Sequence, residues 1–318
     1  MPDAITSDTS PAVQLPTSKP SPQAAAQGIG QAGCVQIPPD IWMSAAPGGL
    51  LLADAHTPPH KPSKCPLVQQ MLDSLLAAGM VALHAGLPNA EAFVKWKSAS
   101  KCALIIDMRS LNAHCPFPPP KFRLPTLLEI GGILRSCHHP PGHISTLDLA
   151  NCFWSIKLPP SNIGCIRIGT PRHTYTLLCV PFGWSHAPGL VQRVIHRTLQ
   201  YAQTPPTPRQ APAAVPASIV QYLDDIAIIA PSADTLAHTL NNAVHALTTA
   251  GFLISPKSLL TPHPSATFIG KHLDAGMGTI STLPTYYASI LILWLRLATG
   301  PCTRRLASRL LGKLVWLA

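Results

Sequence analysis

Acidic side chains are scarce in this sequence, and the few that occur are unevenly placed. Asp and Glu together number 13, against 23 Lys and Arg, and only 11% of the residues are charged. Glutamate occurs only as Glu91 and Glu129, whereas Asp224 and Asp225 stand side by side in an apolar run. The resulting net charge of +10 favours a polyanionic partner, nucleic acid first. A general bias toward basic residues is the alternative.

Paired cysteine motifs and long apolar runs are also missing. The nine cysteines include no Cys-x-x-Cys pair, which argues against a disulfide framework and against a structural zinc site. The N-terminus has no basic region followed by an apolar one, so it lacks the pattern of a secretory signal. Apolar stretches such as 290–295 are far shorter than the roughly 20 residues that span a bilayer. We therefore expect an intracellular protein, cytoplasmic or nuclear, with no membrane partner.

The composition changes near residue 62. Residues 1–62 are rich in Pro, Ala, Ser, Gln and Gly, which predicts a flexible leader or linker, or a join to an upstream part of a larger polyprotein. From Pro66 onward, apolar residues recur at helical spacing, and short apolar runs typical of buried strands follow. The Pro-rich segment 116–125 cannot be regular structure throughout. A folded body is therefore predicted from about residue 63.

Three aspartates carry the strongest chemical signal. Asp224 and Asp225 lie between two apolar runs that predict a strand, a tight turn and a second strand. Taken alone, this pair is most simply a solvated turn. Asp148, however, ends another apolar run, and buried carboxylates repel each other unless a cation binds them. Three carboxylates at neighbouring strand ends suit two Mg²⁺ ions, with Mn²⁺ as an alternative, about 4 Å apart for an in-line displacement.

Several segments, taken in order, resemble the motifs of the reverse transcriptases of retroelements and retroviruses. The resemblance covers about residues 66–318. Its subgroup is left open between long-terminal-repeat and tyrosine-recombinase retrotransposons, and hepadnavirus-like polymerases have similar stretches. The matching segments are Ile106–Asn112 for the fingers, Leu147–Phe153, Val180–Pro188 and Tyr222–Asp225 for three palm motifs, Gly251–Lys257 for a fourth, and Thr267–Lys271 for the strand that grips the primer.

The resemblance implies an α+β right-hand polymerase, with fingers and an antiparallel palm in 63–280 and a partial thumb in 281–318. It implies an RNA-directed DNA polymerase that extends a primer on an RNA or DNA template with deoxynucleoside triphosphates. A place within a larger polyprotein is compatible with it. Asp148 and Asp224 would be the main ligands of two Mg²⁺ ions, and Asp225 would support them. Tyr222 and Leu223 complete the third motif.

The resemblance also implies a nucleotide pocket. Phe153 would lie beneath the sugar and exclude a 2′-OH, although a plain core role for this ring is the alternative. Phe182 and Gly183 would shape the pocket, and Lys257 would lie near the triphosphate. The family usually has a triphosphate-binding Arg where this chain has Ala103, so Lys95, Lys97 or Lys101 would supply the charge. A Lys lacks the bidentate fork of Arg.

Two other functions remain open on these residues. One is a catalytically weak or inactive relative that only binds nucleic acid or a protein, which Ala103 and the low surface charge favour. The other is an RNA-synthesising palm polymerase, which Phe153 argues against. Primer extension with deoxy- and ribonucleotides separates these functions.

Overall fold

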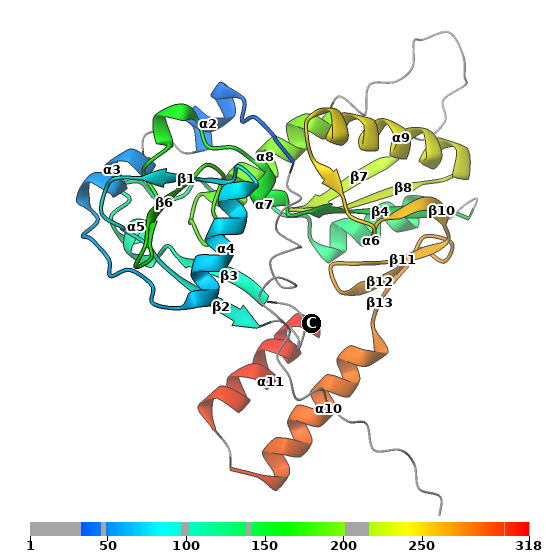
Figure 1. Cartoon of the computed structure of the whole chain (residues 1–318). Coiled ribbons are helices and arrows are strands. Elements are labelled where there is room, and N and C mark those ends of the chain that lie inside the picture. The colour runs from blue at the N-terminus through cyan, green and yellow to red at the C-terminus, as the bar shows by residue number, and fades with distance from the viewer. Residues whose placement is uncertain are drawn as a thin grey trace, which may run out of the picture.

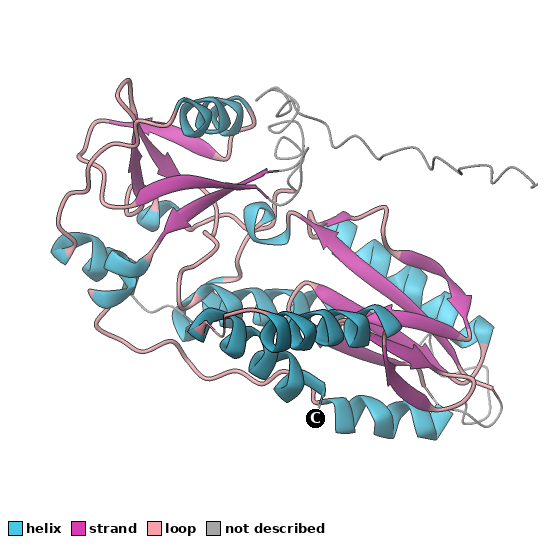
Figure 2. Cartoon of the chain, turned by 90° about the horizontal axis from the view of Figure 1, so that it is seen from below, coloured by secondary structure: helices cyan, strands magenta, loops and turns pink. Residues whose placement is uncertain are grey.

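The computed structural model groups the elements into two lobes and a helical hairpin (Figure 1). Figure 2 shows the strands of the two lobes as separate groups. No helix in the described part of the chain is both long and apolar enough to cross a membrane. The residues that the structure describes are 33–45, 49–96, 102–137, 141–200, 216–301 and 303–317.

The first lobe combines short antiparallel sheets with helices. Strand β6 lies between β1 and β5, and β2 and β3 form a separate hairpin. The hydroxyl of Tyr175 on β6 donates to Asp73 Oδ1 of α4 at 2.6 Å, which ties helix to sheet. The elements are α4 (Pro66–Ala77), β1 (Val81–His84), β2 (Glu91–Trp96), β3 (Cys102–Asp107), α5 (Arg109–Ala113), β5 (Arg167–Gly169) and β6 (Thr174–Leu177).

The second lobe is built on a five-stranded antiparallel sheet. Its strands run in the order β10-β4-β8-β7, and β9 pairs with the end of β4. The strands are β4 (His143–Ala150), β7 (Ser218–Tyr222), β8 (Asp225–Ala230), β9 (Leu253–Ile254) and β10 (Leu259–His263).

Both faces of this sheet are covered. Ile226 and Ile228 of β8 pack into one hydrophobic cluster with α8 (Ala187–Gln200) and α9 (Ala233–Thr249). Ala227 and Ile229, which point the other way, pack against α6 (Leu127–Cys137) and a three-stranded sheet. Double coverage explains why β8 is a continuous apolar run rather than an alternating one. The three strands are β11 (Ser265–Phe268), β12 (Lys271–Asp274) and β13 (Thr279–Thr282).

Two helices follow the second lobe. Helices α10 (Pro284–Thr299) and α11 (Arg304–Leu317) form a hairpin, drawn at the bottom of Figure 1. They pack through their own small cluster, which includes Ile290, Leu293 and Leu310. The hairpin therefore has a core separate from the two lobes.

The described part of the expected leader is folded, so the prediction of a flexible segment up to residue 62 was wrong from residue 33 onward. Helices α2 (Pro39–Ala45) and α3 (Gly49–His56) lie on the first lobe and on α8. Trp42 is buried, and its ring contacts Trp184 at a centroid distance of 5.8 Å. The Pro- and Ala-rich composition conceals a few large apolar residues that reach the core. Residues 1–32 lie outside the described residues.

Candidate catalytic site

The three predicted aspartates meet at one edge of the five-stranded sheet. Asp148 of β4 lies directly opposite Asp225 of β8, and Asp225 lies opposite Tyr222 of β7. Residues paired in this way point to the same face, so these three side chains form a row across three strands. Asp224 lies in the turn that joins β7 to β8. All four side chains are partly buried.

A glutamine of α8 holds this turn. Leu223 has a left-handed backbone, with φ of 55°, which costs roughly 1–2 kcal/mol for a non-glycine residue. Its N–H donates to Gln192 Oε1 at 2.8 Å. The amide of Gln221 donates to the carbonyls of Gln192 and Leu223, both at 3.1 Å. These bonds fix the strained turn and, with it, the position of Asp224.

The aspartates repel one another. Burial raises the pKa of Asp225, and the charges of Asp224 and Asp148 raise it further. Burial is also the main cause that raises the pKa of Asp224, with repulsion from Asp148 added and a backbone hydrogen bond opposing both. The pKa of the buried Cys152 thiol is raised by burial and by the same carboxylates. A divalent cation relieves this kind of repulsion.

The carboxylate oxygens at this edge of the sheet are suitable ligands for a hard cation, although the described residues do not form a complete set of metal ligands. Within the described ranges, no three His, Cys, Asp or Glu side chains are grouped closely enough to hold a metal ion as they stand. Carboxylate oxygens are nevertheless the ligands that Mg²⁺ prefers, and Mg²⁺ keeps several waters and substrate phosphates rather than an all-protein cage. The oxygen donors and their mutual repulsion therefore fit Mg²⁺, and the geometry leaves ligand positions for other partners.

A serine turn holds the backbone of Asp148. Its N–H donates to Ser258 Oγ at 3.0 Å, and its carbonyl accepts from the Ser255 N–H at 2.8 Å. Lys257 lies between these two serines, and its side chain is exposed. The structure therefore brings the predicted Lys257 segment against the first aspartate.

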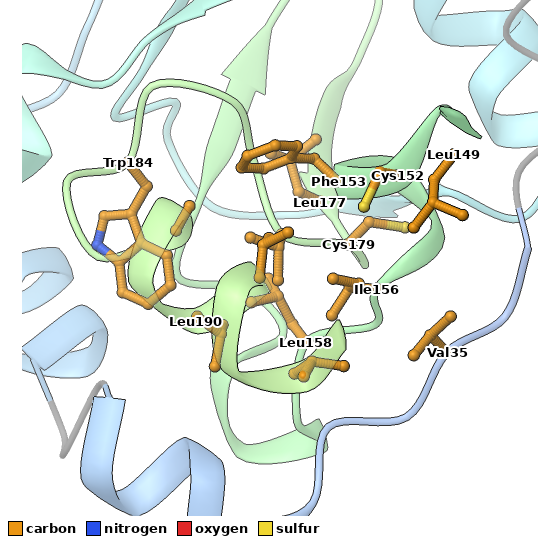
Figure 3. Close-up of a cluster of buried hydrophobic side chains, with 14 of the residues drawn as sticks. Val35, Leu149, Cys152, Phe153, Ile156, Leu158, Leu177, Cys179, Trp184 and Leu190 are labelled. Atoms are coloured by element: carbon orange, nitrogen blue, oxygen red, sulfur yellow. The ribbon is translucent and has the colours of Figure 1, made fainter. Parts of the chain in front are cut away.

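Two predicted pocket residues contact each other. Phe153 belongs to α7 (Cys152–Ser155), which follows β4 immediately, and it is buried in the cluster shown in Figure 3. Its ring centroid lies 4.3 Å from that of Phe182, whose side chain is 62% exposed. Phe153 thus belongs to the core and also meets a solvent-facing ring, so both interpretations of this residue retain support.

The loop that carries Gly183 is anchored to the first lobe. Gly183 has φ of 96°, a conformation that glycine adopts without strain. Its carbonyl accepts from Asn112 Nδ2 at 2.9 Å, and Asn112 Oδ1 accepts from the Ser185 N–H at 3.0 Å. Asn112 therefore clamps the loop from both sides.

The basic residues of the β2–β3 hairpin are only partly described. Lys97 and Lys101 lie outside the described residues. Lys95 is exposed on β2 and lies directly opposite Ala103 of β3. Residues paired across antiparallel strands have Cβ atoms about 5 Å apart. The charge of Lys95 therefore lies next to position 103, where this chain has Ala in place of the family's usual Arg.

Sequence reasoning missed the residues that hold the site. Gln192, Ser258 and Asn112 each bond the backbone of a functional segment from elsewhere in the chain. The only sequence signal for Gln192 is a polar residue directly after the apolar pair Leu190 and Val191 on a helix. Ser258 and Asn112 stand in no recognisable spacing.

Comparison with known proteins agrees with this architecture. Among solved structures, a foamy viral protease-reverse transcriptase in complex with double-stranded DNA superposes with a TM-score of 0.67 at 19% identity. It covers 90% of this chain and 45% of that one. The complex of the foamy viral protein with an RNA/DNA hybrid gives a TM-score of 0.64 at 20% identity, covering 90% and 35%. At these identities the likeness establishes the right-hand α+β polymerase fold.

Curated relatives are retroviral polyproteins. The Gag-Pro-Pol polyprotein of Human T-cell leukemia virus 2 is 25% identical over 72% of this chain and 15% of its own length. That of Bovine leukemia virus is 25% identical over 88% of this chain and 19% of its own length. The chain thus spans less than a fifth of either relative. The family model for reverse transcriptase (RNA-dependent DNA polymerase) matches residues 100–273, more than half of the chain. The chain belongs to the reverse transcriptase family.

Proposed function

We propose that this protein is an RNA-directed DNA polymerase that adds deoxynucleotides to a primer 3′-OH on an RNA or DNA template. The observation that carries this proposal is the edge of the sheet where Asp148 faces Asp225 and Asp224 follows in the adjacent turn. Mutual repulsion among three neighbouring carboxylates destabilises the folded state unless a cation binds them. Their grouping therefore supports a role in cation binding. Membership of a family that uses divalent metal ions supports it independently.

In this mechanism, Asp148 and Asp224 would hold two Mg²⁺ ions, with Asp225 in support. Such ions would supply charge stabilisation for an in-line displacement. The protein itself contributes positioning, which accounts for most of the catalysis in phosphoryl transfer. Gln192 fixes the turn of Asp224, and Ser258 fixes the backbone of Asp148. Lys257 stands in the serine turn that bonds the Asp148 backbone, and it would contribute positive charge for the triphosphate.

The domain assignment is part of the proposal. Residues 63–280 form fingers and palm, residues 281–318 form a partial thumb, and part of the preceding segment is added to the folded body. Gag-Pro-Pol relatives support a place within a larger polyprotein. The foamy viral proteins were solved in complex with double-stranded DNA and with an RNA/DNA hybrid, which supports a template-primer duplex as the partner.

Primer extension is the direct test. The purified chain is incubated with Mg²⁺, a primer annealed to an RNA or DNA template, and either deoxy- or ribonucleoside triphosphates. Extension with deoxynucleotides is the expected result. Absence of extension with both nucleotide types would favour the alternative, a binding module without catalysis, which the loss of the usual Arg at Ala103 favours. A preference for ribonucleotides would contradict the reverse transcriptase assignment.

Phe153 is proposed to select the sugar. Replacing it with Val opens space beside Phe182, where a 2′-OH would otherwise meet the ring. We expect ribonucleotide incorporation, relative to deoxynucleotide, to rise about 100-fold, within the roughly 10–200-fold range of steric discrimination in apolar pockets. The measurement is the ratio of kcat/KM for the two nucleotides. Leu158→Val, a buried change in the same cluster, controls for loosened packing and should leave the ratio unchanged.

Lys95 is proposed to supply the charge that Ala103 lacks. In Lys95→Gln we expect KM for the deoxynucleotide to rise about 10-fold, the size of one lost charge-assisted contact. In the double variant Lys95→Gln/Ala103→Arg, KM should return toward the original value, because the new cation stands on the paired position. Steady-state extension measures both variants. An unchanged KM in Lys95→Gln would assign the contact to another lysine.

A further inference from the structure

The loop of residues 182–186, here called the pocket loop, is backed by three aromatic side chains that contact one another. Trp184 is 2% exposed and contacts both of the others. Its ring centroid lies 5.8 Å from that of Trp42 and 5.2 Å from that of His186. The His186 ring stacks on Trp184 at an interplanar angle of 25°. Helix α2, the pocket loop and the start of α8 therefore meet at Trp184.

His186 links this aromatic stack to the pocket loop and to α8. Its Nδ1 lies 3.2 Å from the Ser185 hydroxyl, and its carbonyl accepts from the Leu190 N–H in the first turn of α8. Burial lowers the pKa of His186, so the ring is neutral at pH 7. A neutral ring stacks on Trp184 without bringing a charge into the core.

Helix α2 is held against α8 by residues on either side of Trp42 in the sequence. Asp40 accepts from Arg197 Nη2 at 2.6 Å. Ser44 Oγ accepts from Arg193 Nη1 at 2.9 Å. Exposed contacts of this kind add little stability. Their effect is to orient α2, so that its buried Trp ring faces the aromatic stack.

The pocket loop also carries a ring that is expected to line the nucleotide pocket. Phe182 is 62% exposed and lies 4.3 Å, centroid to centroid, from Phe153. Phe153 and Trp184 belong to the same buried cluster, which Figure 3 shows. Phe182 is only two residues away from Trp184 in the chain. A shift of Trp184 would therefore move one wall of the expected pocket.

We propose that the stack of Trp42, Trp184 and His186 sets the position of the pocket loop and, through it, the affinity for the incoming deoxynucleotide. Trp42 and His186 are positioning residues, since both act through Trp184. The effect on nucleotide affinity rests on the proposed polymerase function, whereas the effect on the loop does not. When only a fraction of the molecules holds a binding-competent conformation, the apparent affinity falls by that fraction.

Hydrogen exchange tests the stack without catalysis. The Ser185 N–H donates to Asn112 Oδ1, so its exchange rate reports how often the pocket loop leaves its place. The loss of one aromatic pair shifts an equilibrium by up to about 10-fold. In His186→Asn, which removes the ring and keeps a polar side chain, we expect the Ser185 amide to exchange faster by about this factor. Trp42→Leu, from a distant part of the sequence, should have the same effect.

A matched control makes the same substitution at another histidine that contacts an aromatic ring. His173 is exposed and contacts Tyr175 on β6, at a centroid distance of 6.1 Å. His173→Asn should leave the exchange rate of Ser185 unchanged. An unchanged rate in His186→Asn, or an equal increase in the control, would overturn the proposal.

Steady-state primer extension tests the effect on the nucleotide. In His186→Asn and in Trp42→Leu, KM for the deoxynucleotide should rise by up to about 10-fold, with kcat unchanged, because bound nucleotide restores the loop. A purely structural role would instead reduce the amount of folded enzyme, which lowers the apparent kcat and leaves KM unchanged. His186→Phe restores a ring and should return KM toward the original value. An unchanged KM in both single variants would overturn the assignment of nucleotide affinity to the stack.

A double variant tests whether the stack acts as one unit. Trp42→Leu/His186→Asn should raise KM no more than the larger single effect, whereas independent sites would multiply to about 100-fold. Multiplied effects would contradict a shared action through Trp184. Failure of the unmodified chain to extend a primer would refute the polymerase function alone. The exchange rate of Ser185 would then still decide whether the stack holds the loop.

Discussion

Asp148→Asn and Asp225→Asn should each reduce primer extension by at least about 10³-fold at saturating Mg²⁺. Each substitution removes a negative charge from the row in which Asp148 faces Asp225. Losing a single charge-stabilising group in phosphoryl transfer costs roughly 10³- to 10⁵-fold in rate. Single-turnover extension with excess enzyme measures the effect without interference from product release. Asp234→Asn, at an exposed position in the first turn of α9, should leave the rate unchanged.

The same Asp225→Asn substitution should stabilise the fold when metal is removed. Burial and the neighbouring carboxylates raise the pKa of Asp225 in the folded chain. Between the unfolded and the folded pKa the folded state therefore binds more protons, and stability falls as pH rises through this window. Above this window the destabilisation is fully present in the original protein and absent from the variant.

Thermal unfolding in EDTA checks this sign. We expect the Tm of Asp225→Asn to exceed that of the original chain by about 2–4 °C at pH 7, the shift that about 1 kcal/mol produces in a domain of this size. The difference should shrink as pH falls toward the unfolded pKa of about 3.9. A lower Tm for the variant at pH 7 would show that Asp225 makes a stabilising contact.

Trp42→Ala should lower the free energy of unfolding by about 3–5 kcal/mol, the usual cost of truncating a buried Trp. Trp42 is 7% exposed and packs on Trp184, next to the loop of Gly183. Urea unfolding followed by circular dichroism measures the loss. Met43→Ala lies on the same helix with a 64% exposed side chain and should cost less than about 0.5 kcal/mol. Equal effects of the two substitutions would contradict the folding of α2 onto the first lobe.

The aspartate site could be predicted because its signals are local. Apolar residues flank Asp148 and the Asp224–Asp225 pair in the sequence, and burial of such runs brings the carboxylates to a common edge. The direct pairing of Asp148 with Asp225 is a matter of strand register, which depends on residues far apart in the chain. The supporting side chains Gln192 and Ser258 were missed for the same reason.

Composition wrongly predicted a flexible segment before residue 62, because a few large apolar side chains are enough to anchor the described part of this segment. The Pro- and Ala-rich segment before residue 62 contains Val35, Ile41 and Trp42, all buried. The partners of Val35 and Trp42 lie more than 100 residues later in the sequence, so no local pattern predicts these contacts. Likewise, the proximity of Lys95 to Ala103 follows from the pairing of β2 with β3 and cannot be read from the sequence alone. Helical periodicity, by contrast, correctly located α8, where the apolar side is continuous.

The contact between Gly33 and Gly251 has a consequence for how this chain folds. An added Cβ at Gly33 would lie 1.6 Å from the Gly251 carbonyl oxygen, so the two backbones touch directly. These glycines are separated by most of the fingers and palm, which gives the fold a contact of very long sequence separation. During synthesis Gly33 must therefore wait for residue 251, whereas Val35 and Trp42 can meet Ser155 and Trp184 earlier. We expect slow final folding, and aggregation of proteins expressed from residue 58 onward, because the surface around Trp184 would stay uncovered.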